Sequence, residues 1–277
     1  MQTEWVEFMF NNSIISNSQT KQIVLIKFIF LITSIPLFSQ SFESLEFNAI
    51  YIEPESPNDI YSINSNRIKP YVYTLTPDLL SLNVNERKQK FIDLILPSIL
   101  IEKAKIEHMY NYVYANFDHI TLNNQTKVIY DYCKCTDRNE LLVCLANQPN
   151  SIIIAQAALE SGWGTSRFFL EGFNLFGIHT YNLNDSKMKA KGSGDLAIYV
   201  KKYDSLLNSI SNYLRTLATG YAYDEFRKKR LELVDWKEMI RYLDQYSERR
   251  ELYIDDLESI IDYNNLCKYD TLELDVQ

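Results

Sequence analysis

Ile152-Ile-Ile-Ala-Gln-Ala-Ala-Leu-Glu-Ser-Gly-Trp-Gly-Thr-Ser-Arg167 is the most informative stretch of this chain, and Asn174-Leu-Phe-Gly-Ile178 follows it closely. Its first half is apolar on almost every side, which is typical of a helix at the centre of a globular domain. The polar exceptions, Gln156 and Glu160, are four residues apart and so share one face. We therefore predict a central helix that ends near Glu160 in a glycine-rich turn.

Glu160 is the candidate for chemistry in this stretch. The dipole of the helix disfavours a negative charge at its C-terminal end. Burial beside Trp163 would raise the pKa of the carboxyl further. A carboxylic acid that keeps its proton near neutral pH is what cleavage of a glycosidic bond requires. A surface charge at a helix end explains the same pattern equally well.

Three other segments extend the pattern, in the order Asn85 to Pro97, Asp204 to Tyr213 and Tyr246 to Arg250. Together with the Glu160 stretch they resemble glycoside hydrolase family 73, the glucosaminidases that cut peptidoglycan, and specifically its Bax-type branch. The resemblance covers about residues 65 to 270. It implies a mainly α, lysozyme-like α+β fold with a short β-hairpin beside the catalytic cleft.

The resemblance also implies roles for individual residues. Glu160 corresponds to the proton donor of the family. The expected substrate-binding residues are Gln156, Trp163, Asn174, Phe176 and Tyr246. Alternatives stay open for three of them: Trp163 and Phe176 could be core aromatics, and the Asn174 amide could orient Glu160 or cap a turn.

A second catalytic carboxylate is harder to find. An inverting mechanism needs a base about 6.5–9.5 Å from the acid, and several family members take it from the hairpin. Residues 187–203 contain no Glu; Asp195 is their only acid, and Asp185 lies just upstream. Asp195 is therefore the candidate base, although Asp is also a common turn residue. A substrate-assisted route, with the N-acetyl group as nucleophile, would not need it.

Composition limits the possible functions. The 277 residues are 46% hydrophobic and 23% charged, as in ordinary globular proteins. A net charge of −8 argues against nucleic acid as a partner. The spacing of Cys133 and Cys135 is too tight for the usual zinc pair and no His lies close in sequence, so a metal site is not expected. No other cofactor is expected. Cys144 could be a buried thiol or could join a disulfide. The disulfide pairing among Cys133, Cys135, Cys144 and Cys267 stays open.

The N-terminal residues resemble an export signal. Lys21 and Lys27 precede an apolar run, Phe28 to Phe38, that is too short to span a bilayer comfortably. An uncleaved anchor or a buried helix is the alternative. We expect a signal peptide or anchor over 1–40, an extended segment over 41–80 and the glucosaminidase domain over 81–277. No membrane span is expected in the mature chain, which we expect to be monomeric and located in the periplasm, cell envelope or medium.

Periodicity and capping residues predict the remaining elements. A helix should begin at Asn85 and should kink or break at Pro97. A short helix should be capped by Thr136 or Asp137, and Ser151 should open the central helix. Strands are expected over 187–191 and 196–203. Further helices should begin at Asp204 or Ser205, at Asp235 and near Arg250.

The expected function is that of an exported endo-β-N-acetylglucosaminidase that cleaves β-1,4 bonds of peptidoglycan with Glu160 as general acid. Two alternatives remain open at this point. One is a lytic transglycosylase of the same fold. The other is an envelope protein that binds glycan strands with little or no turnover, which the missing hairpin Glu favours.

Overall fold

The computed structural model describes residues 42–190 and 198–276, which lie within one compact unit that spans Gln40–Gln277. The expected signal segment over 1–40 and the candidate base Asp195 lie outside the described residues.

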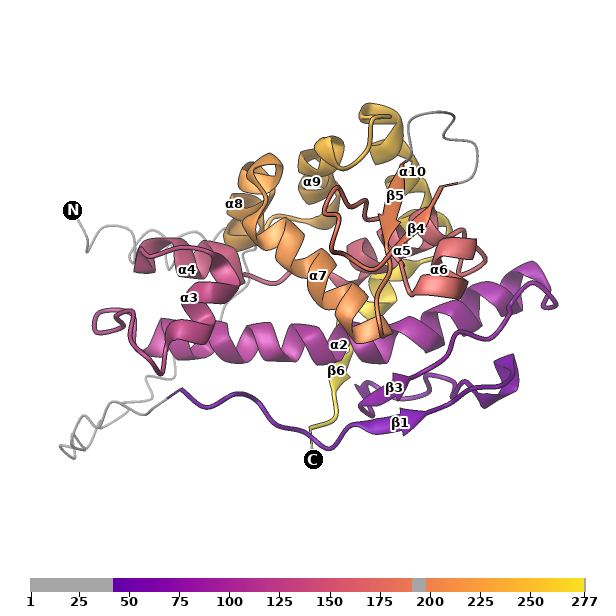
Figure 1. The fold of residues 1–277 in the computed structure, drawn as a ribbon, viewed down its shortest axis with the longest axis horizontal. Helices are drawn as coiled ribbons and strands as arrows, with labels where there is room; N and C mark the ends of the chain where they lie inside the picture. The colour runs from indigo at the N-terminus through magenta and orange to yellow at the C-terminus, as the bar shows by residue number, and fades with distance from the viewer. Residues whose placement is uncertain (1–41, 191–197, 277) are drawn as a thin grey trace, which may run out of the picture. The chain divides into compact units, whose positions relative to one another are not determined.

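Helix α2 (Val84–Ala115) is the longest described element and runs beneath the other helices in Figure 1. The apolar side chains in its middle part belong to the core. The side chain of Asn83 caps its first turn by accepting hydrogen bonds from the backbone N–H groups of Asn85 and Glu86. Of the two outcomes expected at Pro97, a kink or a break, the break does not occur, because α2 continues through this residue. Proline removes one helical hydrogen bond, but the residues around Pro97 are completely buried, so tertiary packing holds this part of the helix in place.

Several elements pack against α2: α4 (Arg138–Leu145), α5 (Asn150–Ser161), α7 (Leu206–Thr219), β3 (Tyr71–Tyr73) and β6 (Glu273–Leu274). The extended N-terminal segment contributes two parallel pairs of short strands, β1 (Ile50–Ile52) with β3 and β2 (Arg67–Ile68) with β6. Its 3-10 turn η1 spans Pro57–Asp59. The segment also buries Ile60, Ile68, Tyr73 and Leu79, so it forms part of the core.

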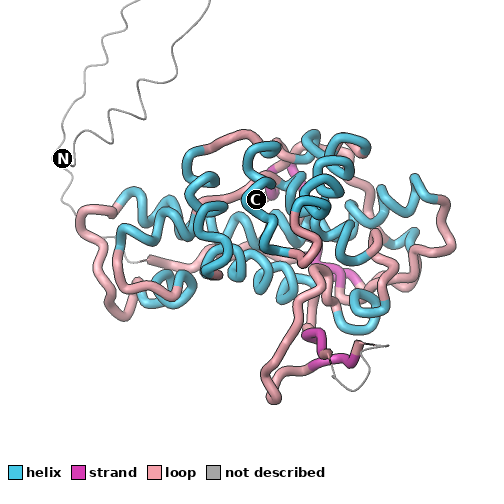
Figure 2. The backbone as a smooth tube through the Cα atoms, turned by 90° about the horizontal axis from the view of Figure 1, so that it is seen from above, coloured by secondary structure: helices cyan, strands magenta, loops and turns pink. Residues whose placement is uncertain are grey.

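The expected antiparallel strand pair is present. Strand β4 (Lys187–Lys189) pairs with β5 (Tyr199–Lys201), with Met188 opposite Val200, and the residues that connect them lie outside the described part. Figure 2 shows helices dominating the rest of the described chain. The expectation of a mainly helical protein with one short antiparallel pair is therefore confirmed.

The remaining helices begin close to their predicted caps. Ser205 caps α7, Asp137 caps α4 and Asp235 caps α9 (Trp236–Ile240), each through a side-chain oxygen. The other helical elements are α3 (Lys127–Cys133), α6 (Arg167–Gly172), η2 (Tyr221–Tyr223), α8 (Asp224–Glu232), η3 (Arg241–Tyr246), α10 (Glu251–Tyr263) and η4 (Leu266–Tyr269).

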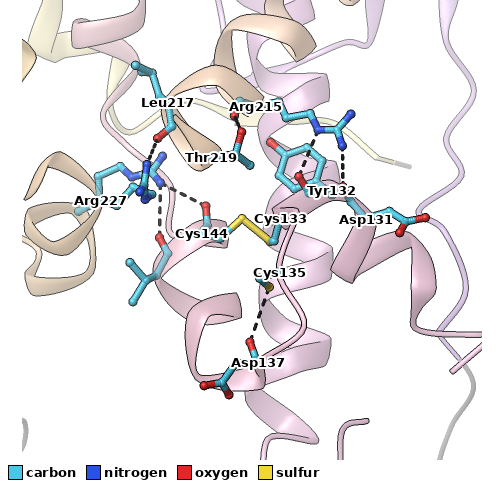
Figure 3. Close-up of a disulfide and its surroundings, with 12 residues drawn as sticks. Asp131, Tyr132, Cys133, Cys135, Asp137, Cys144, Arg215, Leu217, Thr219 and Arg227 are labelled. Atoms are coloured by element: carbon cyan, nitrogen blue, oxygen red, sulfur yellow. Dashed lines mark hydrogen bonds between the residues drawn. A yellow bond between two sulfur atoms is a disulfide. The ribbon is translucent and has the colours of Figure 1, made fainter. Parts of the chain in front are cut away.

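A disulfide joins Cys133 at the end of α3 to Cys144 in α4, with their Cα atoms 5.8 Å apart (Figure 3). Cys135 and Cys267 are free thiols. Arg215 of α7 donates hydrogen bonds to the backbone carbonyls of Asp131 and Tyr132 beside this link. The pairing that the sequence left open is thereby assigned, and α3, α4 and α7 are connected at one end of α2.

Within 42–190 and 198–276, no single helix is long and apolar enough to cross a membrane. Helices α4 and α5 pass that test only as a pair with a 68° bend between them.

Candidate active site

Helix α5 ends one residue after Glu160, and the local sequence explains why. Gly162, Trp163 and Gly164 all have positive φ angles, of 60°, 57° and 78°, which reverse the direction of the chain. The hydroxyl of Ser161 accepts a hydrogen bond of 3.0 Å from the backbone N–H of Gly164. A Cβ atom on Gly164 would lie 2.7 Å from a ring carbon of Phe91, so only glycine fits here.

The start of α5 differs from the prediction. Ser151 does not open the helix, because α5 begins at Asn150, after Pro149. The backbone N–H and the hydroxyl of Ser151 instead donate to the carboxylate of Asp270, at 2.7 and 2.9 Å. This contact attaches α5 to the chain just after η4, far away in the sequence.

Glu160 is mostly buried, but part of its surface remains accessible. Burial raises the pKa of its carboxyl from 4.5 to about 7, although a hydrogen bond from the Tyr253 hydroxyl and the positive charge of Arg249 act in the opposite direction. The pKa values of Tyr213, Tyr223, Tyr246 and Tyr253 are all raised, chiefly by burial, and the nearby Glu160 charge contributes to each. The acid therefore lies in a pocket of tyrosine side chains and is half protonated near neutral pH.

The turn after α6 forms one wall of this pocket. Gly177 has φ +65°, and a Cβ atom on it would lie 2.9 Å from Oε2 of Glu160. Asn174 holds the turn in place: its amide nitrogen donates to the carbonyls of Ile178 and Lys201, and its amide oxygen accepts from the N–H of Ile178. The turn-capping alternative for Asn174 is thus the observed one, and it connects β5 to the wall of the acid pocket.

Gly177→Ala should lower activity by about 10- to 100-fold, because a displacement of about 1 Å at a reacting group can cost that much. The added methyl group would push the Glu160 carboxyl out of its position. Gly162→Ala is the matched control, since Gly162 also has a positive φ, of 60°, but its Cβ would meet Thr165. Rates measured on purified cell wall should fall much further for Gly177→Ala; equal losses would mean that backbone strain alone is responsible.

Two predicted substrate contacts need correction. Gln156 has no exposed side-chain surface, and both ends of its amide are bonded to tyrosine hydroxyls, so it cannot contact a glycan directly. Phe176 is 1% exposed and stacks on Tyr213 with ring centroids 3.8 Å apart. Both residues support the pocket from inside, which for Phe176 is the core-packing alternative.

Tyr246 and Trp163 remain at the surface in part. The Tyr246 hydroxyl donates to the carbonyl of Phe176 at 3.0 Å, and its ring stacks on Tyr253 beside Glu160. Trp163 packs edge-on against Phe91, with the Lys88 ammonium 4.8 Å from its ring centroid. The structure thus brings Tyr246 to the acid, whereas the described side-chain contacts of Trp163 are to α2.

Of the two acids near the hairpin, only Asp185 lies in the described part of the chain. It accepts hydrogen bonds from the Thr180 hydroxyl at 2.7 Å and from the Asn182 amide at 3.2 Å. These contacts are those of a turn residue.

Sequence analysis missed Tyr253, Tyr213 and Gly177 as parts of the site. Gly177 and Tyr213 fall in segments that resemble the family and Tyr253 follows one of them, but with 20 tyrosines in the chain nothing in the sequence singles out which tyrosines reach Glu160.

The sequence of this region resembles known proteins. The model of the Glucosaminidase family, described as mannosyl-glycoprotein endo-beta-N-acetylglucosaminidase, matches residues 145–266. This region belongs to the glucosaminidase family. Protein bax of Escherichia coli (strain K12) is 33% identical over 121 residues, or 42% of either chain. The resemblance to the family and to its Bax-type branch is confirmed over this glucosaminidase region, and the chain spans less than half the length of that relative.

Two solved structures resemble the chain more distantly. The catalytic domain of the autolysin Auto from Listeria monocytogenes is 23% identical and covers 58% of this chain and 96% of its own, with a TM-score of 0.39. A peptidoglycan hydrolase from Sphingomonas sp. A1 is 24% identical, covers 50% and 91%, and has a TM-score of 0.38.

Proposed function

We propose that the protein is an exported peptidoglycan hydrolase, an endo-β-N-acetylglucosaminidase that cleaves β-1,4 bonds with Glu160 as general acid. The observation that carries this proposal is the burial of Glu160 among tyrosines, which raises the pKa of its carboxyl to about 7. An acid with this pKa is protonated often enough at neutral pH to donate a proton, and strong enough to do so readily.

The proposed reaction uses this geometry. The protonated carboxyl of Glu160 donates its proton to the glycosidic oxygen as the bond to the anomeric carbon breaks. The hydroxyl of Tyr253 then stabilises the carboxylate that forms, because it donates a hydrogen bond to it. Trp163 and Tyr246 are the proposed contacts for the sugar rings, since both keep exposed surface.

Asp195, the candidate base for activating water, lies outside the described residues. Residues 187–203 contain no Glu, so a substrate-assisted route by the N-acetyl group is the form of the mechanism that we favour. Asp195→Asn should then retain most of the wild-type rate, because Asn adopts the same turn conformations. Loss of turnover with unchanged glycan binding and melting temperature would instead identify Asp195 as the base.

Product analysis tests the proposed function directly. Digestion of purified peptidoglycan should release fragments with a reducing N-acetylglucosamine end, as measured by mass spectrometry. A 1,6-anhydro-muramic end would establish the lytic transglycosylase instead. Binding to insoluble peptidoglycan without any soluble product, even after long incubation, would establish the glycan-binding protein that the missing hairpin Glu favours.

A further inference from the structure

A line of buried polar side chains leads from α8 to the candidate acid, and it begins at Arg230. This residue is 3% exposed, and burial lowers the pKa of its guanidinium only to about 10, so it stays charged. It donates to the amide oxygen of Gln148 at 3.1 Å, and also to the backbone carbonyl of Cys144. Among the described residues, no carboxylate lies within ion-pair distance of Arg230.

The line continues from Gln148 toward Glu160. The amide nitrogen of Gln148 donates to the Tyr213 hydroxyl at 3.1 Å, and that hydroxyl donates to the amide oxygen of Gln156 at 2.5 Å. The amide nitrogen of Gln156 donates to the Tyr253 hydroxyl at 3.0 Å. The Tyr253 hydroxyl is in turn the hydrogen-bonding group that lowers the pKa of the Glu160 carboxyl. Every side chain between Arg230 and Glu160 is at most 3% exposed, so water does not interrupt the line.

The direction of the hydrogen bonds along this line is determined by its first member. A guanidinium can only donate, so Gln148 must present its oxygen to Arg230 and its NH₂ group to Tyr213. The Tyr213 proton is then free for Gln156, which presents its oxygen to Tyr213 and its NH₂ group to Tyr253. The Tyr253 hydroxyl accepts from Gln156, so its single proton is free and points at Glu160.

We propose that Arg230 and Gln148 are positioning residues for the general acid, acting through a one-way hydrogen-bond relay that ends at Glu160. This inference rests on the proposed role of Glu160. Because every proton in the relay points toward Glu160, the relay stabilises the carboxylate that is left after proton donation. It therefore lowers the pKa that burial alone would produce, and makes Glu160 a stronger acid.

Reversal of the relay is a direct test, and Gln148→Glu provides it with almost no change of shape. A carboxylate at this position accepts from Arg230 but cannot donate to Tyr213, so the Tyr213 proton turns toward residue 148. The amide of Gln156 then turns around and accepts the Tyr253 proton through its oxygen. The Tyr253 hydroxyl can then only accept from Glu160, so the carboxyl of Glu160 keeps its own proton. The pKa of Glu160 should rise by about one or more, the effect of losing one hydrogen bond to a charged group.

The measurement is the pKa of Glu160 by ¹³C NMR of glutamate-labelled protein, with the Glu160→Gln spectrum to assign the signal. The other charged or titratable groups that act on Glu160 should be unchanged in the variants: Arg249 and the hydroxyls of Tyr223 and Tyr246. The basic limb of the pH–rate profile should move to higher pH by the same amount as the pKa of Glu160 measured by NMR.

Tyr213→Phe provides the matched control, because it cuts the relay but keeps the ring that stacks on Phe176. In a double-mutant cycle, the rise caused by Gln148→Glu should vanish in the Tyr213→Phe background. A rise that persists there would show a direct effect of the added charge, and would overturn the relay. An unchanged pKa in Gln148→Glu would overturn it as well.

If Gln148→Glu does not fold, Gln148→Met supplies a neutral variant of similar length. It removes the donor to Tyr213 without reversing the relay, so the pKa of Glu160 should still rise, but by less. No rise in Gln148→Met would count against the relay. The NMR readout does not depend on turnover: if the pKa shifts as expected but no peptidoglycan is cleaved, the relay stands and the proposed function fails.

Discussion

Glu160→Gln is expected to abolish the clearing of peptidoglycan in a zymogram, with a fall in rate of about 10²- to 10⁴-fold. This is the typical contribution of general acid catalysis, and the amide has no proton of comparable acidity to donate. The measurement is the release of soluble fragments from purified cell wall. A variant that retains the full rate would remove Glu160 from the mechanism.

Stability measurements supply the control for this variant. The folded-state pKa of Glu160 is about 7 against an ordinary value of 4.5, so the folded protein holds this proton more tightly than the unfolded chain. The stabilisation is fully present below pH 4.5 and is lost as the pH rises through 7, by about 3 kcal/mol. Glu160→Gln removes this dependence and should melt at a higher temperature than wild type at pH 8. A lower melting temperature would mean that its inactivity reflects misfolding.

The second large effect is that of pH on the wild-type rate. The donor must be protonated, and half of the Glu160 carboxyls lose their proton at about pH 7. The rate should therefore fall by about 50-fold between pH 7 and pH 9, with a slope that approaches tenfold per pH unit at the upper end of this range. Initial rates between pH 5 and pH 9 on a soluble glycan fragment would measure this basic limb of the pH–rate profile.

Tyr253→Phe tests the origin of that limb. The Tyr253 hydroxyl lowers the pKa of Glu160 by donating a hydrogen bond to the carboxylate. Its removal should move the basic limb to higher pH and lower the maximal rate. A limb that stays in place would assign it to another group, and a limb near pH 4.5 in the wild type would show that Glu160 is not the buried acid described above.

Much of this protein could be predicted from local sequence. Helix α5 is apolar on nearly every side, and Gly162 and Gly164 after Glu160 mark its end, so the central helix and the position of the acid follow from residue type and spacing alone. The caps Ser205, Asp137 and Asp235 also act locally, through hydrogen bonds to residues two or three positions ahead. The β4–β5 pair was visible because its strands are separated by few residues.

Contacts between distant segments could not be predicted in this way. Pro97 breaks a helix in isolation but not in α2, because the packing of the whole unit compensates for the lost hydrogen bond. Gln156 shares a face with Glu160, yet only the tertiary structure shows that Tyr213 and Tyr253 occupy both ends of its amide. The sequence marks Glu160 as an acid, but its pKa and the direction of its hydrogen bonds arise from α7, α8 and α10. Burial and hydrogen bonding depend on which segments meet, and that is a property of the folded chain as a whole.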